Sequence, residues 1–293
     1  MTQSDPLLAA EAVRIDDHGP ALEQLTMTTT GANVAILGAP RALFEAACGL
    51  RDATSGTLRV CGLPPREAAR TAAIASAPAS AKTPARWTAL DLAIENARLA
   101  GHGRRESARL AATALEAMKL EPRGKTRLGD ASPSVARAAM LAAALATGAP
   151  ALLVEDFTPG LPDGAARALA RSFVQACRGR RWVLFAGRLA LSSPLGLEAD
   201  EAVLFSGGRL AGAGSPAELA TRDRTFSVRT AGESPLAFAD KLREHGAQVD
   251  ADETGRALTV TIPEGFSTLE LVALARSSDV VVVELLPLSG AVA

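Results

Sequence analysis

The most constraining feature of this sequence is an apolar run that leads through a tight turn into a helix-like stretch. Val34–Leu37 forms the run, Gly38-Ala39-Pro40 forms the turn, and a helical pattern begins at Arg41. A phosphate-binding loop has this outline, but it requires G-x-x-x-x-G-K-[ST], whose glycines free backbone N–H groups for phosphates and whose lysine reaches them. Counted from Gly38, Leu43 and Phe44 occupy the positions of the second glycine and the lysine. The turn is therefore present without the residue types that hold phosphate.

Composition excludes several classes of protein. With 293 residues and 48% hydrophobic content, the chain is long enough for one large domain and a small one. The net charge of −1 and the absence of Tyr argue against a nucleic-acid partner, which would favour a basic excess and stacking aromatics. The N-terminus does not resemble a signal peptide, and the longest apolar tract is interrupted near residue 147. We expect a cytoplasmic protein with three reduced cysteines.

Strand and helix patterns alternate as far as about residue 222, which predicts an α/β domain over residues 1–222. The part from about 78 to 127 has helical patterns only, and we interpret it as a helical insertion. The Pro-punctuated segment 75–84 is predicted to be a loop or hinge. Strands are expected at 33–37, 57–61, 151–155, 182–186 and 202–205, and helices at 41–50, 89–101, 106–119, 134–147 and 164–178.

The pattern changes after residue 224. A turn sequence, Asp252-Glu253-Thr254-Gly255, lies between two strand patterns and predicts a hairpin. The elements follow the order βαββαβ, which is that of a ferredoxin-like domain. We expect a small α+β domain over residues 225–293, with the boundary near 222–224. Its elements are expected at 226–230, 235–245, 247–250, 257–262, 268–276 and 280–285.

Three segments carry a resemblance to a known family. They are GLRDATSGTLRVCG (Gly49–Gly62), ALLVEDFTPGLPDGAAR (Ala151–Arg167) and GGRLAGAGSPAEL (Gly207–Leu219). In order and spacing they resemble the nucleotide-binding subunit of an ABC transporter: the exit from its P-loop helix, its Walker B strand with D-loop, and its closing hairpin. The resemblance implies a P-loop NTPase-like core with a helical subdomain. The C-terminal part is similar, more loosely, to the appendage of ABC-2-type drug and polymer exporter subunits.

The resemblance also assigns positions to the groups that bind and cleave ATP. At the phosphate-binding loop it places Pro40 at the lysine and Arg41 at the hydroxyl, with the loop about three residues short. The Walker B Asp-Glu pair is replaced by Glu155-Asp156, which displaces each carboxylate by roughly one methylene. The simplest interpretations are an ordinary strand-to-helix turn at Gly38 and solvated carboxylates at the end of a strand.

The other family positions have changed as well. The signature glycines are absent, and Ser132 and Ser134 flank Pro133 there, where we expect the serines to cap a helix. Ala79 occupies the Q-loop glutamine position, and Gly187 occupies the switch histidine position. His18 lies near the position of the aromatic residue that stacks on adenine. No set of metal ligands is expected.

These losses favour a degenerate cassette that does not hydrolyse ATP. It would be a subunit of an ABC transporter complex, with export favoured by the C-terminal resemblance. It would lie on the inner face of the cell membrane, attached there through an integral membrane permease. It would also pair with itself or with a competent second cassette, whose site would bind ATP and Mg²⁺. Two alternatives remain open: a weakly active ATPase that uses Arg41, Glu155 and Asp156, and a binding or dimerisation module built on a cassette scaffold. The transported substrate is not encoded in this subunit.

Overall fold

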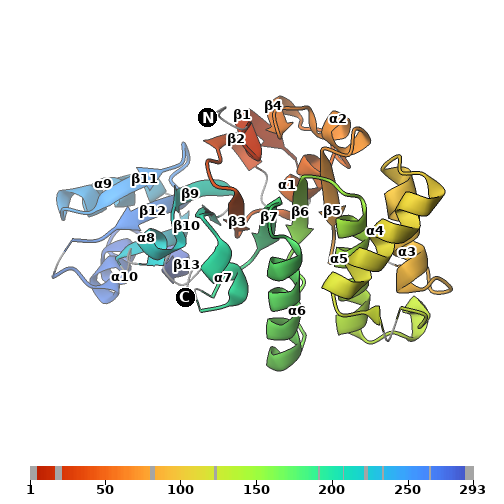
Figure 1. Ribbon diagram of the computed structural model, residues 1–293. Coiled ribbons are helices and arrows are strands. Elements are labelled where there is room, and N and C mark those ends of the chain that lie inside the picture. Colours follow the sequence, from red (N-terminus) through yellow and green to blue (C-terminus); the bar gives the residue numbers. More distant parts are fainter. Residues whose placement is uncertain are drawn as a thin grey trace.

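A computed structural model of the chain describes residues 5–16, 22–79, 83–121, 124–190, 192–206, 208–220, 224–232, 234–263 and 265–287. Figure 1 shows a central sheet with the helices α3, α4 and α5 at one end and a second, C-terminal sheet at the other. Among the described residues, no helix has the length and apolar character needed to cross a membrane.

The central sheet has six strands in the order β5-β6-β7-β3-β8-β9. Neighbouring strands run parallel, except that β9 is antiparallel to β8. Parallel strands require crossover connections, and helices supply them here. The strands are β3 (Asn33–Leu37), β5 (Ile74–Ala77), β6 (Ala151–Glu155), β7 (Arg181–Ala186), β8 (Glu201–Ser206) and β9 (Arg209–Gly214).

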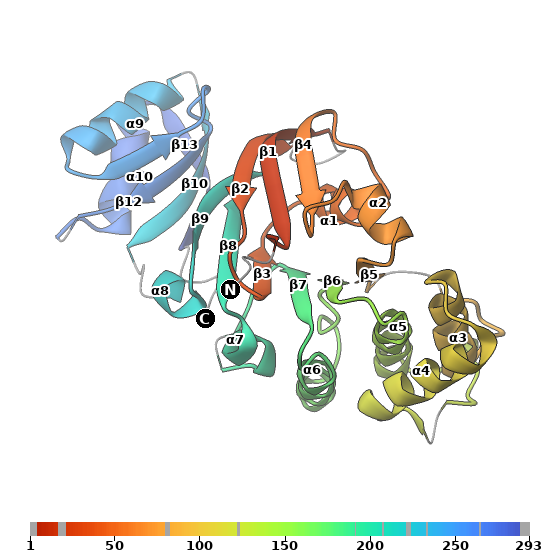
Figure 2. The same ribbon diagram turned by 45° about the horizontal axis from the view of Figure 1, so that its top comes forward.

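Both faces of this sheet are buried. Successive side chains of a strand point to opposite sides, so each strand contributes to two cores. On β7, Trp182 and Leu184 belong to one core, whereas Val183 and Phe185 belong to the other. Figure 2 shows α3, α4, α5 and α6 on one side of the sheet and a small antiparallel sheet, β2-β1-β4, on the other. The strands of the small sheet are β1 (Leu8–Ile15), β2 (Leu22–Thr28) and β4 (Ser55–Val60), and α1 (Arg41–Ala47) and α2 (Pro65–Arg70) lie on its side.

The helical side carries α3 (Ala89–Leu99), α4 (Arg104–Ala117) and α5 (Pro133–Ala146), with a 3₁₀ turn, η2 (Leu128–Asp130), before α5. A capping box begins α3: Thr88 accepts from the Asp91 backbone N–H, and the Asp91 carboxylate accepts from the Thr88 N–H. The α/β part is completed by α6 (Asp163–Ala176), α7 (Pro194–Glu198) and α8 (Pro216–Ala220).

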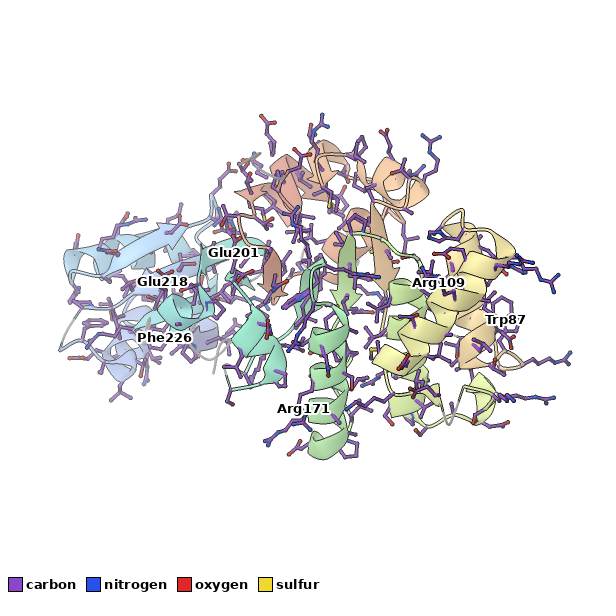
Figure 3. All side chains as sticks on the ribbon, in the orientation of Figure 1. Trp87, Arg109, Arg171, Glu201, Glu218 and Phe226 are labelled. Atoms are coloured by element: carbon purple, nitrogen blue, oxygen red, sulfur yellow. The ribbon has the colours of Figure 1, made fainter. Side chains whose placement is uncertain are left out.

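One buried carboxylate ties the turn before β3 to the sheet. Glu201 on β8, labelled in Figure 3, accepts hydrogen bonds from the backbone N–H groups of Thr30 (2.6 Å) and Gly31 (2.7 Å). Its side chain also lies 3.2 Å from the Thr30 hydroxyl. Because buried charges require hydrogen-bond partners, this cluster holds the start of β3 in register with β8.

The C-terminal part contains β10 (Thr225–Gly232), α9 (Pro235–Glu244), β11 (Gln248–Ala251), β12 (Ala257–Thr261), α10 (Thr268–Arg276) and β13 (Val280–Pro287). Their order is the expected βαββαβ, and they form an antiparallel sheet in the order β11-β12-β10-β13. The expected hairpin turn joins β11 to β12, with Gly255 at φ +69° and its N–H donating to Asp252 O. The domain boundary at 222–224 remains a prediction, and residues 221–223 lie outside the described part of the chain.

The structure differs from the sequence expectations in three segments. Residues 75–77, expected in a loop, belong to β5 and pair with Leu152, Leu153 and Val154 of β6. Strand pairing overrides the weak strand preference of alanine and serine in that segment. The helix expected at 41–50 ends at Ala47, and the positive φ of +75° at Gly49 suits a helix exit. The strands β1 and β2 were not expected from sequence patterns.

Candidate functional site

The turn after β3 is closed by bonds within the protein. The Gly38 N–H donates to Ala186 O of β7 at 2.9 Å. Gly38 has φ +71°, and a Cβ at this position would lie 2.5 Å from Phe205 O, so only glycine is accommodated. Pro40 is the N-cap residue of α1 and contributes no side-chain capping bond. The turn therefore joins a strand to a seven-residue helix and does not form a glycine-rich phosphate cradle.

Arg41 begins α1 and faces two carboxylates. Its Nε lies 3.1 Å from Glu45 Oε1, one helical turn further along α1. Its Nη1 lies 3.8 Å from Glu155 Oε1 at the end of β6. About half of the Arg41 side chain is exposed. The sequence placed Arg41 as a candidate phosphate-binding residue, but in the structure its positive charge is already balanced by carboxylates of the chain.

Glu155 joins three of the positions that the sequence singled out. One carboxylate oxygen lies near Arg41, and the other accepts the Ala79 backbone N–H at 2.9 Å. The Glu155 side chain is only 21% exposed, so it is not the solvated strand-end carboxylate that we expected. The positions that the resemblance assigns to Walker A, the Q-loop and Walker B thus contact one another through Arg41, Ala79 and Glu155.

Asp156 takes part in a local turn, apart from the group of contacting residues Arg41, Glu45, Ala79 and Glu155, which we call the Arg41 cluster. Its Oδ1 accepts from the Thr158 N–H at 2.9 Å and from the Thr158 hydroxyl at 2.8 Å. The following loop is held from α5, because Arg137 Nη1 donates to Phe157 O and Pro159 O. The adjacent carboxylates therefore have separate structural roles.

The serines at the signature position do not cap α5 with their side chains, contrary to our expectation. Ser132 is the N-cap residue by position, but it makes no side-chain capping bond. Its hydroxyl lies 3.1 Å from the Ser134 hydroxyl, so the two side chains bond each other. Pro133 is the first helical residue and lacks an N–H, so this helix start has one backbone donor fewer than it would with another residue there.

Gly187, at the switch position, is exposed at the end of β7, and an added Cβ would meet no atom within 4 Å. A side chain would therefore fit at position 187, although glycine provides none. Over the ranges that the structure describes, no group of three or more His, Cys, Asp or Glu residues is placed to hold a metal ion. The candidate at His18 lies outside the described residues.

One contributing residue, Glu45, was not found from the sequence. Its second carboxylate oxygen lies 3.0 Å from Arg51 Nη2, so Glu45 links two arginines beside the turn. The i,i+4 spacing of Arg41 and Glu45 on a helix was the available signal, because residues four apart lie on the same face.

Solved structures with the same arrangement identify the fold. An ATP-binding subunit of an ABC transporter matches with a TM-score of 0.61 at 17% identity, over 74% of this chain and 92% of that one. The chain has the fold of an ATP-binding cassette. The structure of cbiO1 from Clostridium perfringens, part of the ABC transporter complex cbiONQ, matches with a TM-score of 0.61 at 17% identity, over 73% of this chain and 90% of cbiO1.

A nucleotide-free ATP-binding cassette from an ABC transporter is also similar, with a TM-score of 0.58 at 16% identity, over 72% of this chain and 91% of that one. No family model matches the sequence, and no curated protein does. The likeness to ATP-binding cassettes therefore lies in the three-dimensional arrangement, at sequence identities of 16–17%.

Proposed function

We propose that this chain is a non-catalytic ATP-binding-cassette subunit of an ABC transporter, which supports a membrane permease without itself cleaving ATP. The observation that carries the proposal is the contact among three nucleotide-facing positions. Glu155 accepts the Ala79 N–H and lies 3.8 Å from Arg41 Nη1. Groups that would surround a nucleotide in a competent cassette here satisfy one another.

Electrostatics argue against a triphosphate at this turn. An anion that approached Arg41 would also approach the carboxylates of Glu45 and Glu155, both within 4 Å of the guanidinium. Like charges at such distances repel, and the repulsion grows where water is partly excluded. With no lysine and no free glycine loop to offset it, the turn favours its own ion pairs over phosphate.

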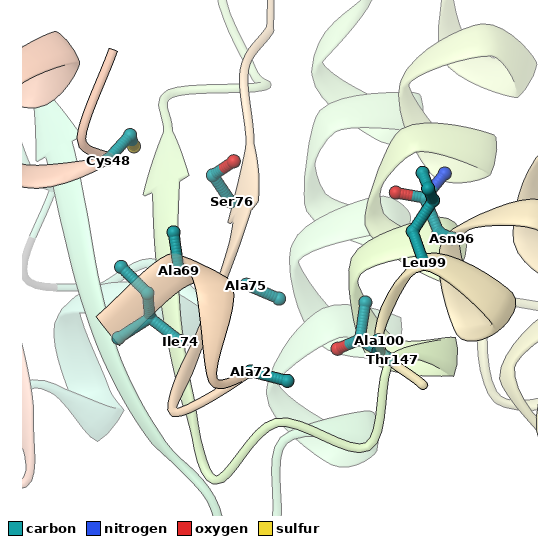
Figure 4. A pocket seen from close by; sticks show the side chains of 10 residues that line it. All are labelled: Cys48, Ala69, Ala72, Ile74, Ala75, Ser76, Asn96, Leu99, Ala100 and Thr147. Atoms are coloured by element: carbon teal, nitrogen blue, oxygen red, sulfur yellow. The ribbon is translucent and has the colours of Figure 1, made fainter. Parts of the chain in front are cut away.

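A hollow beside the cluster is the proposed docking place for the permease. It has a volume of about 170 Å³ and lies between the α2–β5 segment and α3. Figure 4 shows Ala69, Ala72 and Ile74 on one wall, with Asn96 and Leu99 across from them. Leu99 is 78% exposed. Small side chains on one wall and an exposed leucine on the other suit a cytoplasmic helix of a permease with an apolar face.

The remaining parts of the proposal concern assembly. We propose that the chain lies on the inner face of the cell membrane through the permease, and that it pairs with a second cassette, either itself or a competent partner. Ser132 and Ser134 would then face the partner's nucleotide in place of a signature. An exporter is favoured, on the likeness of the C-terminal part to exporter appendages.

The docking proposal is tested by flotation of the purified chain with native membrane vesicles. Leu99→Glu is expected to reduce association, because it places a charge in the hollow. Leu269→Glu changes a similarly exposed leucine on α10 and serves as the matched control. Equal flotation of the wild-type chain and both variants would contradict permease docking at this hollow.

A further inference from the structure

A groove of about 730 Å³ lies between α6 and α7, away from the Arg41 cluster and built from other residues. Three arginines line it: Arg167 and Arg171 of α6, and Arg178, which follows the end of that helix. The α7 side contributes Pro194 and Leu197. The groove therefore combines a basic wall with a partly apolar one.

Arg167 and Arg171 occupy one face of α6, and Arg178 lies in the turn after the helix ends at Ala176. At 3.6 residues per turn, positions 167 and 171 lie about 40° apart around the helix axis. Leu169 and Phe173, on another face, are buried in the core. The arginines are exposed, as Figure 3 shows for Arg171. The helix and the turn that follows it thus place a row of guanidinium groups along the groove.

These arginines have no carboxylate partner among the described residues. Elsewhere on the surface, Arg98, Arg109 and Arg243 each form an ion pair with an acid three residues away. Asp163 stands four residues before Arg167, and Glu198 also lines the groove, yet neither forms an ion pair with the row. The row is therefore available to an anionic ligand.

We infer that this groove binds an extended acidic segment of a partner protein, with carboxylates at its first and third positions opposite Arg167 and Arg171 and another further along the segment, towards Arg178. A helix rises 1.5 Å per residue, so Arg167 and Arg171 are spaced by about 6 Å along α6. An extended chain advances about 3.3 Å per residue, so a step of two residues matches this spacing. Each guanidinium can donate two parallel N–H hydrogen bonds to one carboxylate.

The apolar wall distinguishes this ligand from a bare inorganic anion. Leu197 is 76% exposed on the α7 side of the groove, and Val174 also lines it. A peptide carries side chains that cover such residues, whereas a phosphate does not. No aromatic side chain lines the groove, so the stacking that single-stranded nucleic acids use is not offered.

The test uses fluorescence anisotropy of a labelled hexapeptide with glutamates at its first, third and sixth positions, leucine at its fourth and alanine elsewhere. The purified full-length chain is expected to bind it, more weakly as salt increases. Arg167→Gln/Arg171→Gln/Arg178→Gln is expected to weaken binding by about tenfold or more, because three charge-assisted contacts are lost. The control Arg86→Gln/Arg104→Gln/Arg105→Gln removes the same charge from exposed arginines elsewhere and is expected to change binding less than about twofold.

Three results would overturn the inference. One is an equal loss of binding in both triple variants, which would indicate general attraction to positive charge. Another is equally tight binding of a hexapeptide with its three glutamates adjacent. A third is displacement of the labelled peptide by inorganic tripolyphosphate at a lower concentration than any unlabelled peptide needs to displace it, which would assign the groove to phosphate. Circular dichroism checks that each variant is folded, and Arg171→Gln alone replaces the triple variant if that one is not.

Discussion

Arg41 Nη1 lies 3.8 Å from Glu155 Oε1, beside the turn that joins β3 to α1. The second Glu155 oxygen accepts the Ala79 N–H, and Arg41 also pairs with Glu45. These contacts give the charges of Arg41, Glu45 and Glu155 partners within the chain.

The Arg41–Glu155 pair is expected to contribute little to stability. Both side chains reach solvent, and exposed pairs contribute about 0.2–1 kcal/mol. A double-mutant cycle with Arg41→Gln and Glu155→Gln, measured by urea unfolding, is expected to give a coupling of about 0.5 kcal/mol. Glu155→Gln keeps an oxygen for the Ala79 N–H, so the cycle isolates the charge. The Arg98–Glu95 pair, at 3.7 Å, is the matched control. A coupling several times larger than that of the control would show that the cluster is a stabilising core.

Glu201 is expected to matter much more. It is buried and accepts the N–H groups of Thr30 and Gly31. Glu201→Ala leaves both donors without their partner and is expected to lower the free energy of unfolding by about 2–4 kcal/mol. Glu116→Ala, on the exposed face of α4, is expected to change it by less than about 0.5 kcal/mol. Urea unfolding checks both variants, and similar effects of the two would contradict the structural role of Glu201.

The cysteines are expected to differ in reactivity. Burial raises the pKa of the Cys48 and Cys177 thiols to about 12, and it also raises the pKa of the half-buried Cys61. Because the thiolate is the reactive form, Cys61 is expected to react first with a disulfide reagent at pH 8, with a rate that increases up to pH 10. Cys48 and Cys177 are expected to react only on unfolding. The rapid phase is expected to vanish in Cys61→Ser, and its persistence would refute this assignment.

Glu270 is expected to make the stability of the C-terminal part depend on pH. The Ser267 backbone N–H, and then the Ser267 hydroxyl, hold the pKa of Glu270 below its usual 4.5. A lowered pKa in the folded state adds stability above about pH 4.5, and this stability is lost as the pH falls through the folded-state pKa. Glu270→Gln is therefore expected to lower the thermal midpoint of this part more at pH 7 than at pH 3. A difference that persists unchanged at pH 3 would exclude an effect of the charge.

Sequence patterns predicted the regular elements where apolar runs or helix caps are clear. The bounds of β3 (Asn33–Leu37), β6 (Ala151–Glu155) and α10 (Thr268–Arg276) agree with the expectation. The strand β1 was not expected because bulges interrupt its alternation: its register shifts between Ala10 and Ile15, and Ala12 has φ +48°. The strand β5 was not expected because its alanine and serine side chains have a weak strand preference.

The candidate site was predicted in part. Position by position, the sequence indicated that Pro40, Ala79 and Gly187 lack the family's functional groups. The contact between Arg41 and Glu155 could not be predicted, because it joins distant parts of the chain and depends on side-chain geometry. Likewise, nothing in the sequence showed that the hydroxyls of Ser132 and Ser134 would bond each other and leave α5 without a side-chain cap.

The most direct test of the account is equilibrium binding of a fluorescent ATP analogue with Mg²⁺ to the purified chain, beside a cassette with an intact phosphate-binding loop. The account predicts no saturable binding up to millimolar nucleotide, because Glu45 and Glu155 already hold Arg41 and the turn has no lysine. Micromolar binding that is lost in Arg41→Gln would contradict it and favour the weakly active ATPase.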